Sequence, residues 1–431
     1  MEKIAVIGAG HVGLVTSACF AELGNKVICI DNNKKKIMAL LNGKIPIYEP
    51  GLSTLVKKNI KKKRLFFSTS IKDVVRFARI IFIAVGTPSK KKGAADLSAV
   101  ESVSAEIARH MKSYKLIVEK STVPVETGRW VEYTLNGFKE QRIKFDIASN
   151  PEFLKEGSAI ESFMHPDRIV IGVQTKKAED LLKKLYKPLK TPILVTDIKS
   201  AEIIKHASNS FLSMKISFIN TISRICDLCG ADIKKVAEGM GLDKRIGKGF
   251  LNAGVGYGGF CFPKDLAAFI HIAENHGYNP EILKAVAKVN QQQKIAFVNK
   301  IKSALWNLNN KTIGILGIAF KPNTDDIRLA PSLDIIKMLQ KEGSRIKAYD
   351  PKAMEKAKDA LKGIEFCKDP YSVAKGSDCL VIITEWDEFR KLNLKRIRDL
   401  LNQPIVIDGR NMFEPDDMRK LGFRYICMGR R

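Results

Sequence analysis

Cysteine is scarce in this sequence: only eight of its 431 residues are cysteines, and they are spread thinly along the chain. That count excludes a disulfide framework, which small secreted domains use to compensate for a small core. Cys226 and Cys229 form the one Cys-x-x-Cys, within a stretch of helical character, and no second pair follows. The six histidines show no ligand spacing. We therefore expect neither a structural zinc nor another metal site.

Long apolar runs are also absent. No run reaches the roughly 18 residues that a membrane helix needs, so we expect no membrane insertion. The sequence begins almost directly with a strand-like segment at residues 4–7, without the apolar core and cleavage site of a signal peptide. That pattern favours a cytoplasmic location. The length of the chain gives room for two or three domains with cores of their own.

Acidic residues are the third shortage. The chain has 46 Asp and Glu against 73 Lys and Arg, which gives a formal net charge of +27. Such charge first indicates nucleic acid as a partner. The lysine clusters at residues 34–36, 57–64 and 90–92, which we expect in loops, lack interleaved aromatics that would stack on bases. We therefore favour a solvated basic surface that attracts anionic small substrates, and expect no nucleic-acid partner.

A dinucleotide-binding pattern opens the chain. A strand-like segment at residues 3–8 leads into a Gly-x-Gly-x-x-Gly motif made by Gly8, Gly10 and Gly13, then a helix at about 14–23 and a strand at 27–30 that ends at Asp31. The glycines let a pyrophosphate approach the helix N-terminus, and an acid 18 residues past the last glycine accepts from a ribose hydroxyl. We predict NAD over NADP, although the lysines at 34–36 soften that preference.

Further strand-like segments end in polar residues. Residues 79–85, 116–119 and 145–148 are followed by Thr87, Thr122 and Glu152 respectively. In open parallel sheets ligands bind beyond the carboxyl ends of the strands. Each of these residues is also found as a helix cap, and Thr87 alone is equally consistent with that role, but three such ends favour a functional crevice.

The middle of the chain is mainly helical, from about residue 198 to 300, with one long helix expected at 201–228. Lys205 and Asn209 lie four residues apart and therefore share one face of that helix. A lysine and an asparagine on a largely apolar helix are costly to bury, so we expect them to have a function.

The last third repeats the first. A strand-like segment at residues 311–317 starts a second strand–turn unit, and the next strand, at 345–349, ends at Asp350 as the first half's ended at Asp31. The segments at residues 379–384 and 404–408 correspond to those at 79–85 and 116–119 in the first half. Because the first turn lacks the glycine motif, we expect it to hold another ligand, such as the nucleotide end of a substrate.

These patterns predict an α/β protein in which two doubly wound Rossmann-like domains are joined by a central helical domain with a long helix. The expected boundaries are residues 1–197 for the NAD-binding domain, 198–300 for the helical domain and 301–431 for the second Rossmann-like domain.

Cys261 is the leading candidate for a nucleophile. It lies in Gly-Tyr-Gly-Gly-Phe-Cys-Phe-Pro-Lys-Asp at residues 256–265, and Pro263 fits a first helical position. The helix dipole then favours the thiolate. With one NAD site, this thiol indicates oxidation of an aldehyde to an acid through a thiohemiacetal and a thioester. Lys205 and Asn209 suit a developing oxyanion, while Asp265, and Glu152 or Thr122 through a water, suit proton transfer.

Other motifs follow one another in a defined order. They are Asn-Pro-Glu-Phe-Leu-Lys-Glu-Gly at residues 150–157, Asp-Arg-Ile-Val-Ile-Gly at 167–172, Ala-Phe-Lys at 319–321 and Asp-Asp-Ile-Arg at 325–328. Together with residues 8–13, 205–209 and 256–265, they make the chain resemble the UDP-glucose/GDP-mannose dehydrogenase family over essentially its whole length. Tyr257 and residues 262–265 are similar to its UDP-glucose group.

The resemblance implies a four-electron oxidation, in which UDP-glucose, two NAD and water give UDP-glucuronate and two NADH. It implies that Cys261 is the nucleophile, assisted by Lys205, Asn209 and Asp265, and that Thr122 and Glu152 position water or protons. It also implies a homodimer through the helical domain, with Arg245 reaching the substrate of the partner subunit.

Two sets of binding residues follow from the same resemblance. On the NAD side they are Gly8, Gly10, Val12, Gly13, Asp31, Lys36, Thr87, Thr122, Glu156, Lys264 and Arg328. For the nucleotide sugar they are Glu152, Phe153, Leu154, Lys155, Lys205, Asn209, Arg245, Phe250, Leu251, Asn252, Ala253, Gly254, Gly258, Lys321 and Arg410.

Two departures and several alternatives remain. The overall charge is far more basic than this chemistry requires. Phe260 stands where family members often carry serine, which changes the packing around Cys261. GDP-mannose and UDP-N-acetylmannosamine dehydrogenases are the near alternatives. A two-electron hydroxyacid dehydrogenase needs neither Cys261 nor a third domain. A non-catalytic NAD sensor leaves Cys261, Lys205 and Asp265 without a purpose, and DNA binding that stays tight at moderate salt would favour a nucleic-acid-binding protein.

Overall fold

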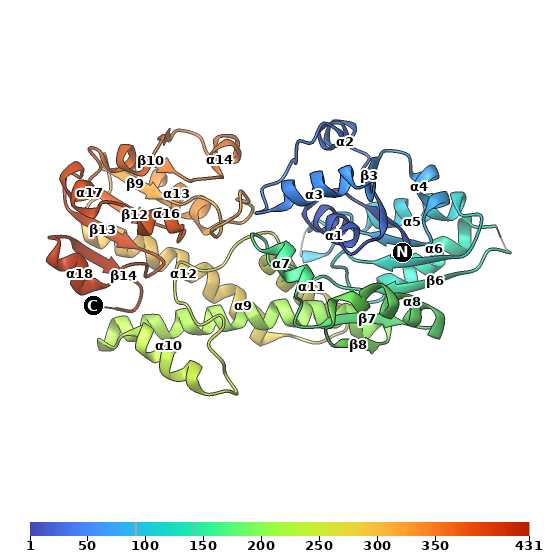
Figure 1. The fold of residues 1–431 in the computed structure, drawn as a ribbon. Coiled ribbons are helices and arrows are strands. Elements are labelled where there is room, and N and C mark those ends of the chain that lie inside the picture. The colour runs from blue at the N-terminus through green and yellow to red at the C-terminus, as the bar shows by residue number, and fades with distance from the viewer. Residues whose placement is uncertain (91–92, 141, 431) are drawn as a thin grey trace. The chain divides into compact units, whose positions relative to one another are not determined.

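The computed structural model describes residues 1–90, 93–140 and 142–430. The chain divides into two compact units. Unit 1 comprises Met1–Ser208 and Ala267–Tyr278, and unit 2 comprises Asn209–Leu266 and Asn279–Arg431. Each unit contains one β-sheet covered by helices, as the labelled elements of Figure 1 show.

Unit 1 is built on an eight-stranded sheet of order β3-β2-β1-β4-β5-β6-β7-β8. Its strands are β1 (Lys3–Ile7), β2 (Lys26–Ile30), β3 (Leu65–Ser68), β4 (Ile80–Ile83), β5 (Lys115–Glu119), β6 (Phe145–Ser149), β7 (Ile169–Val173) and β8 (Ile193–Thr196). The first six run parallel, which confirms the predicted doubly wound half. β7 pairs antiparallel with β6, and the sequence did not indicate this reversal.

Helices cover both faces of this sheet because its strands are apolar on both sides. Ile4 and Val6 of β1 share one core with α1 (His11–Glu22), α2 (Lys34–Leu41), α3 (Leu52–Lys61), α7 (Ala159–Met164) and α8 (Lys176–Tyr186). Ala5 and Ile7 share the other with α4 (Ile71–Phe77), α5 (Ser98–His110) and α6 (Thr127–Phe138). Successive residues of a strand point to opposite faces, so one continuous apolar strand serves both layers.

Unit 2 contains a six-stranded, wholly parallel sheet of order β11-β10-β9-β12-β13-β14. Its strands are β9 (Thr312–Leu316), β10 (Arg345–Tyr349), β11 (Glu365–Phe366), β12 (Cys379–Ile382), β13 (Ile405–Asp408) and β14 (Arg424–Cys427). Its covering helices include α13 (Pro331–Lys341), α14 (Met354–Ala360), α15 (Pro370–Ala374), α16 (Asp387–Arg390), α17 (Leu394–Leu400) and α18 (Pro415–Lys420). The strand order repeats that of the first six strands of unit 1, as the sequence predicted.

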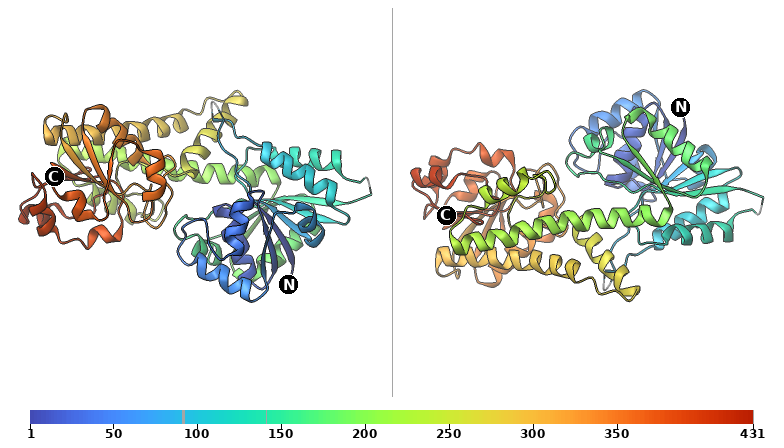
Figure 2. Two further views of the ribbon diagram at one scale, coloured as in Figure 1. Left: turned by 90° about the horizontal axis from the view of Figure 1, so that it is seen from above. Right: turned by 90° about the horizontal axis from the view of Figure 1, so that it is seen from below.

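Long helices make up the middle of the chain. α9 (Ile198–Cys229) has 32 residues and is the long green helix of Figure 2. It is followed by α10 (Ile233–Leu242), α11 (Cys261–Asn275) and α12 (Glu281–Leu305). The predicted long helix and the predicted fold class are therefore confirmed. The three domain boundaries remain predictions, because compactness divides the chain within α9 and α11 instead.

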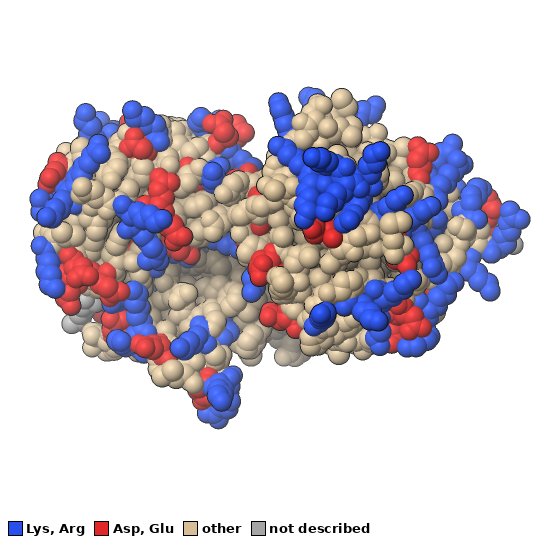
Figure 3. Space-filling view, viewed as in Figure 1, with Lys and Arg blue, Asp and Glu red and all other residues tan. Residues whose placement is uncertain are grey.

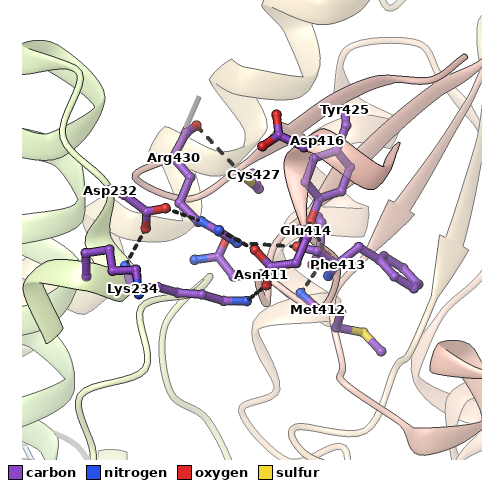
Figure 4. A network of polar contacts seen from close by, with 12 residues as sticks. Asp232, Lys234, Asn411, Met412, Phe413, Glu414, Asp416, Tyr425, Cys427 and Arg430 are labelled. Carbon is purple, nitrogen blue, oxygen red and sulfur yellow. Dashed lines mark hydrogen bonds and ion pairs between the residues drawn. The ribbon is translucent and has the colours of Figure 1, made fainter. Parts of the chain in front are cut away.

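Arg430 holds α10 against the rest of unit 2 (Figure 4). Its guanidinium pairs with Asp232, the N-cap of α10, at 3.0 Å and with Glu414 at 2.5 Å, and Lys234 pairs with the same Glu414 at 2.6 Å. These two cations lower the pKa of Glu414 to about 2. A carboxylate shared by two cations is a stronger tie than an isolated surface pair.

Two lysine clusters lie on helices, so their expected placement in loops is wrong. Residues 34–36 open α2, and exposed Lys57, Lys58 and Lys61 lie on α3. Figure 3 shows basic side chains gathered over this part of unit 1. In the third cluster, residues 91 and 92 lie outside the described residues. α3 places its apolar side on the core and its lysines in solvent, which is the pattern of an amphipathic surface helix.

Candidate active site

The first strand–helix turn of unit 1 is packed on one side and open on the other. A Cβ on Gly13 would lie 1.8 Å from the carbonyl oxygen of Gly8, so only glycine fits there. A Cβ on Gly10 would meet nothing within 4 Å. The open side adjoins the N-terminus of α1, where unpaired N–H groups and the helix dipole favour an anion. The turn therefore fits the pyrophosphate of a dinucleotide.

Asp31 follows β2 and faces the same turn. Its carboxylate accepts from the backbone N–H of Ala9 at 2.9 Å and of Asn33 at 2.9 Å, and from the amine of Lys36 at 2.8 Å. Burial raises the pKa of Asp31, but these three donors outweigh burial and hold the pKa below its usual value. The carboxylate is therefore ionised at neutral pH and suited to accept from a ribose hydroxyl. Lys36, predicted on the NAD side, is its direct ion-pair partner.

The ends of β4 and β5 are joined by the predicted threonines. The buried Thr87 hydroxyl donates to the backbone carbonyl of Thr122 at 2.8 Å. Ser121, which follows the end of β5, donates from its hydroxyl to the backbone carbonyl of Val85 at 2.7 Å. The structure thus brings Thr87 and Thr122 together, as expected for carboxyl ends of neighbouring parallel strands.

Glu152 and Lys205 form a buried ion pair in unit 1. The Lys205 amine of α9 lies 3.1 Å from Glu152 Oε1, and both side chains are almost completely buried. The other oxygen of Glu152 accepts from the Leu154 N–H at 2.7 Å. Beside the pair, the Arg168 guanidinium stacks on the Phe153 ring at 3.8 Å from the centroid. A fixed carboxylate and a fixed cation of this kind can exchange protons and stabilise an oxyanion.

Lys120 is a buried residue that the sequence reasoning missed. It directly follows β5, and its amine donates to the side-chain oxygen of Asn150 at 3.0 Å. Burial lowers the pKa of Lys120 to about 7, which neighbouring Glu152 raises and Lys205 lowers. Lys120, Asn150 and Glu152 line a small cavity of about 40 Å³. A lysine directly after a buried strand, ahead of Ser-Thr, was the available signal.

Cys261 is the first residue of α11 and is exposed. This confirms its predicted place at a helix N-terminus, although the helix begins two residues before Pro263. Within the same turn, Asp265 lies 2.7 Å from the Lys264 amine and accepts from the Asn209 amide at 2.6 Å. Asn209, Asp265 and Lys264 are all buried. The thiol thus shares its helical turn with a carboxylate of fixed orientation.

The glycine-rich segment before Cys261 is clamped by side chains that the sequence reasoning also missed. Asn290 of α12 accepts from the Tyr257 N–H at 2.9 Å and donates to its carbonyl at 3.0 Å. Gln293 donates to the Gly254 carbonyl, and Asn220 of α9 accepts from the Gly254 N–H. These three polar side chains are buried on helices. Nothing in their local sequence indicated partners some 30 or more residues away.

Phe260 contacts two residues predicted on the NAD side. The Arg328 guanidinium lies 4.4 Å and the Lys264 amine 5.4 Å from the centroid of its ring. Arg328 also pairs with Asp326 at 2.6 Å. A ring face attracts cations, so Phe260 draws both side chains toward itself, which a serine does not do.

The remaining predicted substrate residues of unit 2 differ in how far they are buried. Arg410 lies against the clamped segment, because it donates to the carbonyls of Ile383 at 2.7 Å and Gly256 at 3.3 Å. Lys321 is half-buried. By contrast, Arg245 has an 89% exposed side chain and pairs with its neighbour Asp243. The segment from Phe250 to Gly254 is buried at three positions, Leu251, Ala253 and Gly254.

The other predicted residues of unit 1 surround the first turn or the end of β6. Glu156 lies 3.9 Å from His11, the residue after Gly10, and Glu49 lies 3.0 Å from the same ring. Burial lowers the pKa of His11, but these carboxylates raise it above its usual value overall. Val12 is half-buried, and Lys155 is exposed.

Within residues 1–90, 93–140 and 142–430, no group of three or more His, Cys, Asp or Glu side chains is arranged to hold a metal ion. Cys226 and Cys229 lie on α9, one buried and one exposed. None of the described helices combines the length and the apolar character that a membrane crossing demands.

Three family profiles match consecutive parts of the chain. The NAD binding domain of the UDP-glucose/GDP-mannose dehydrogenase family matches residues 2–190, its central domain residues 199–292 and its UDP binding domain residues 314–415. Most strands of the two sheets described above therefore lie within an NAD-binding and a UDP-binding domain.

Curated relatives and solved structures agree with these matches. A UDP-glucose 6-dehydrogenase of Bacillus subtilis is 48% identical over 100% of this chain and 94% of its own, and one of Rhizobium meliloti is 44% identical over 99% of both. A UDP-glucose dehydrogenase of Pyrobaculum islandicum superposes with a TM-score of 0.93 at 37% identity, over 99% and 97% of the chains. A UDP-D-ManNAc dehydrogenase of Pyrococcus horikoshii gives 0.88 at 26%, over 99% of both.

Proposed function

Because this chain belongs to the UDP-glucose/GDP-mannose dehydrogenase family, we propose that it oxidises UDP-glucose to UDP-glucuronate through a covalent intermediate on Cys261. The observation that carries the proposal is the position of Cys261. It is exposed at the N-terminus of α11, within one turn of Asp265, whose carboxylate is held by Lys264 and Asn209. A simple alcohol dehydrogenase has no use for such a thiol.

The proposed reaction has two oxidations and one hydrolysis. The glycine turn and Asp31 would hold NAD⁺, which would supply the hydride acceptor for each oxidation. The primary alcohol of the sugar loses a hydride and a proton to give an aldehyde, and the Cys261 thiolate adds to that carbonyl to give a thiohemiacetal. Loss of the second hydride and a proton gives a thioester. Water then adds, the thiolate leaves and the acid is released, so NAD is consumed twice per sugar.

The oxyanion and proton roles fall to four buried residues, Lys205, Asn209, Glu152 and Asp265, and to the half-buried Thr122. Lys205 stabilises the developing alkoxide, and Asn209 donates a neutral hydrogen bond beside it. Glu152 and Thr122 position the hydrolytic water, and the Asp265 carboxylate accepts a proton. The 3.1 Å Lys205–Glu152 pair supports these assignments, because it holds the amine and the carboxylate in fixed positions.

Substrate recognition is proposed for both ends of the nucleotide sugar. Glu152 to Lys155 and residues 250–254 contact the sugar, together with Gly258, Lys321 and Arg410. Asn290 and Gln293 hold the backbone at Tyr257 and Gly254. These hydrogen bonds support that role, since a backbone fixed by buried side chains can present N–H and C=O groups to a ligand. GDP-mannose and UDP-N-acetylmannosamine are the alternative substrates, and turnover on a panel of nucleotide sugars distinguishes them.

A cytoplasmic homodimer through the helical domain is part of the same proposal. Phe211, Phe218 and Ile225 of α9 are 57%, 49% and 51% exposed and recur every seven residues, which makes an apolar stripe along one side of the helix. Arg245, exposed after α10, is proposed to reach the partner's substrate. Sedimentation of the Phe218→Glu variant tests the dimer: it should yield monomers, and an unchanged mass contradicts this interface.

The mechanism is tested by Cys261→Ala against Cys229→Ala, a matched loss of another exposed cysteine. The first variant should form no UDP-glucuronate while it binds NAD with wild-type affinity, and the second should retain full activity. Product analysis by mass spectrometry and NAD titration provide the two readouts. Wild-type acid formation by the Cys261 variant contradicts the covalent step.

A further inference from the structure

A cluster of basic residues lies at the end of the unit 1 sheet where β4 and β5 begin. The glycine turn lies at the opposite end, where β1 finishes. Among the basic residues, a pocket of about 380 Å³ opens between the N-terminal ends of β4 and β5. Four of its lining side chains are cations: Arg76 from the last turn of α4, Arg79 before β4, Lys115 at the start of β5 and Lys177 in α8. None of these residues belongs to the proposed catalytic or nucleotide-binding sets.

Lys115 is the most informative of the four, because it is buried. Its side chain is part of a residue only 3% exposed, and its amine donates to the backbone carbonyl of Ala78 at 2.6 Å. Burial lowers the pKa of Lys115. A buried ammonium with one neutral acceptor is costly to fold around. The Ala78 carbonyl belongs to the C-cap of α4, which a single cation satisfies, so capping does not account for Arg76, Arg79 and Lys177.

A carboxylate beside the pocket already accepts a hydrogen bond from another pocket residue. Tyr114 lines the pocket and donates from its hydroxyl to the Asp146 carboxylate at 2.5 Å. Lys177 lies over the Tyr114 ring, 3.2 Å from the centroid, rather than beside a carboxylate. Among the described residues, neither Arg76 nor Arg79 has an ion-pair partner within 4.0 Å. The pocket thus gathers four cations, none of which forms an ion pair within 4.0 Å among the described residues.

We propose that this pocket binds a small anion with two or more negative charges, of the phosphate or diphosphate class, at a site separate from the glycine turn. Two guanidinium groups provide planar donor pairs that match phosphate oxygens, and the two amines add point charges. Its volume admits a diphosphate group with a small substituent. The site accounts for part of the basic excess that the oxidation chemistry leaves unexplained.

Calorimetric titration of the full chain with inorganic pyrophosphate tests the proposal. Saturating NAD and UDP are present throughout, so that the glycine turn and the UDP site cannot report. One saturable site is expected, and Arg76→Ala/Arg79→Ala should weaken its affinity at least tenfold. The control Lys61→Ala/Lys62→Ala removes the same charge from exposed positions at the end of α3 and should change affinity less than twofold. Equal weakening in both variants, or no saturable binding by the wild type, overturns the proposal.

Lys115→Met separates a ligand role from a structural one. If the buried amine serves the anion, the variant loses pyrophosphate binding at least tenfold while its melting temperature stays the same or rises, because a buried charge has been removed. If Lys115 only caps α4, the variant melts lower and binds pyrophosphate like the wild type, which overturns its assignment to the site. Wild-type affinity in this variant contradicts the assignment at any melting temperature.

Discussion

The unit 2 sheet repeats the strand order of the first six strands of unit 1. The two sheets differ in the hydrogen bonds made by the aspartate that follows their second strand. In unit 1, Asp31 accepts from two backbone N–H groups and from Lys36, and it is half-buried. In unit 2, the corresponding Asp350 is 1% exposed and accepts from five N–H donors. Those donors are the backbone groups of Ile318, Ala319, Lys352 and Ala353 and the indole of Trp386. Asp31 therefore retains capacity for a ligand, whereas Asp350 is a structural centre.

The segments that follow β1 and β9, the first strands of the two sheets, also differ. α1 begins at His11, directly after Gly10, so its N-terminus adjoins the turn. After β9 the next helix begins only at Pro331, fourteen residues past Gly317. Only unit 1 thus has a helix N-terminus to hold a phosphate at this point. The same topology can bind NAD in one copy and a different ligand elsewhere in the other.

A second pair of strand ends repeats the contrast. Glu119 ends β5 and Asp408 ends β13, each paired with the last residue of the preceding strand in the sheet. Asp408 accepts from Arg410, Met412, Phe413 and Tyr425. Both oxygens of Glu119 are buried with no hydrogen-bond partner among the described residues. Burial, with Glu202 nearby, raises the pKa of Glu119 well above its usual value. The carboxylates of Asp350 and Asp408 in unit 2 thus accept several hydrogen bonds each, whereas that of Glu119 in unit 1 accepts none among the described residues.

The largest expected effect comes from Asp350→Ala. Five buried donors lose their acceptor, so we expect the free energy of unfolding to fall by about 3–5 kcal/mol. Urea denaturation followed by circular dichroism measures it. Asp350→Asn keeps one acceptor oxygen and should lose less. A loss below that of Asp31→Ala would remove the distinction between the two carboxylates.

Asp31→Ala should affect the cofactor rather than the fold. Loss of a charged hydrogen-bond acceptor is expected to weaken NAD binding by roughly ten- to a hundredfold, or about 1.5–3 kcal/mol. The NADP to NAD preference should rise, because no carboxylate then repels a 2′-phosphate. Fluorescence titration with both cofactors measures the ratio. An unchanged ratio would exclude Asp31 from ribose recognition.

Lys120→Met should change how stability depends on pH. In the folded protein Lys120 loses its proton near pH 7, whereas in the unfolded chain it does so near pH 10.4. Between these values folding releases a proton, so raising the pH stabilises the wild type by up to about 1.4 kcal/mol per pH unit through this group.

The comparison of the two proteins isolates that contribution. Lys120→Met lacks the titrating amine, so its stability relative to wild type should be greatest near pH 7 and decrease as the pH rises to 9. Chemical denaturation at several pH values provides the measurement. A difference that does not vary with pH would mean that Lys120 is protonated throughout.

Phe260→Ser should have the smallest effect. The change removes the ring that Arg328 and Lys264 face, a contact of about 0.5–2 kcal/mol in total, so the KM for NAD should rise by up to about thirtyfold with little change in kcat. Phe260→Tyr keeps the ring and should behave as wild type. An unaltered KM in the serine variant would show that the ring does not help to position these cations for NAD.

The sequence predicted what depends on local pattern. The glycine turn, Asp31, the strand ends and the start of a helix at Cys261 all follow from residues close together in the chain, and each lies where expected. The long helix follows from apolar spacing alone.

What the sequence did not predict depends on distant segments. The antiparallel β7 has the same apolar composition as a parallel strand, so its direction is invisible in the pattern. Asn290 and Gln293 are ordinary polar residues on α12 until the segment before Cys261 packs against them. The basic pocket needs three separate segments, around Arg79, Lys115 and Lys177, to meet at one edge of the sheet.

The most direct test of the covalent four-electron reaction is the number of NADH formed per UDP-glucose consumed, measured with the full chain and excess NAD. We predict two, with UDP-glucuronate as the product. A value of one, with an aldehyde or ketone as product, contradicts the covalent oxidation at Cys261 and places the chain among two-electron dehydrogenases.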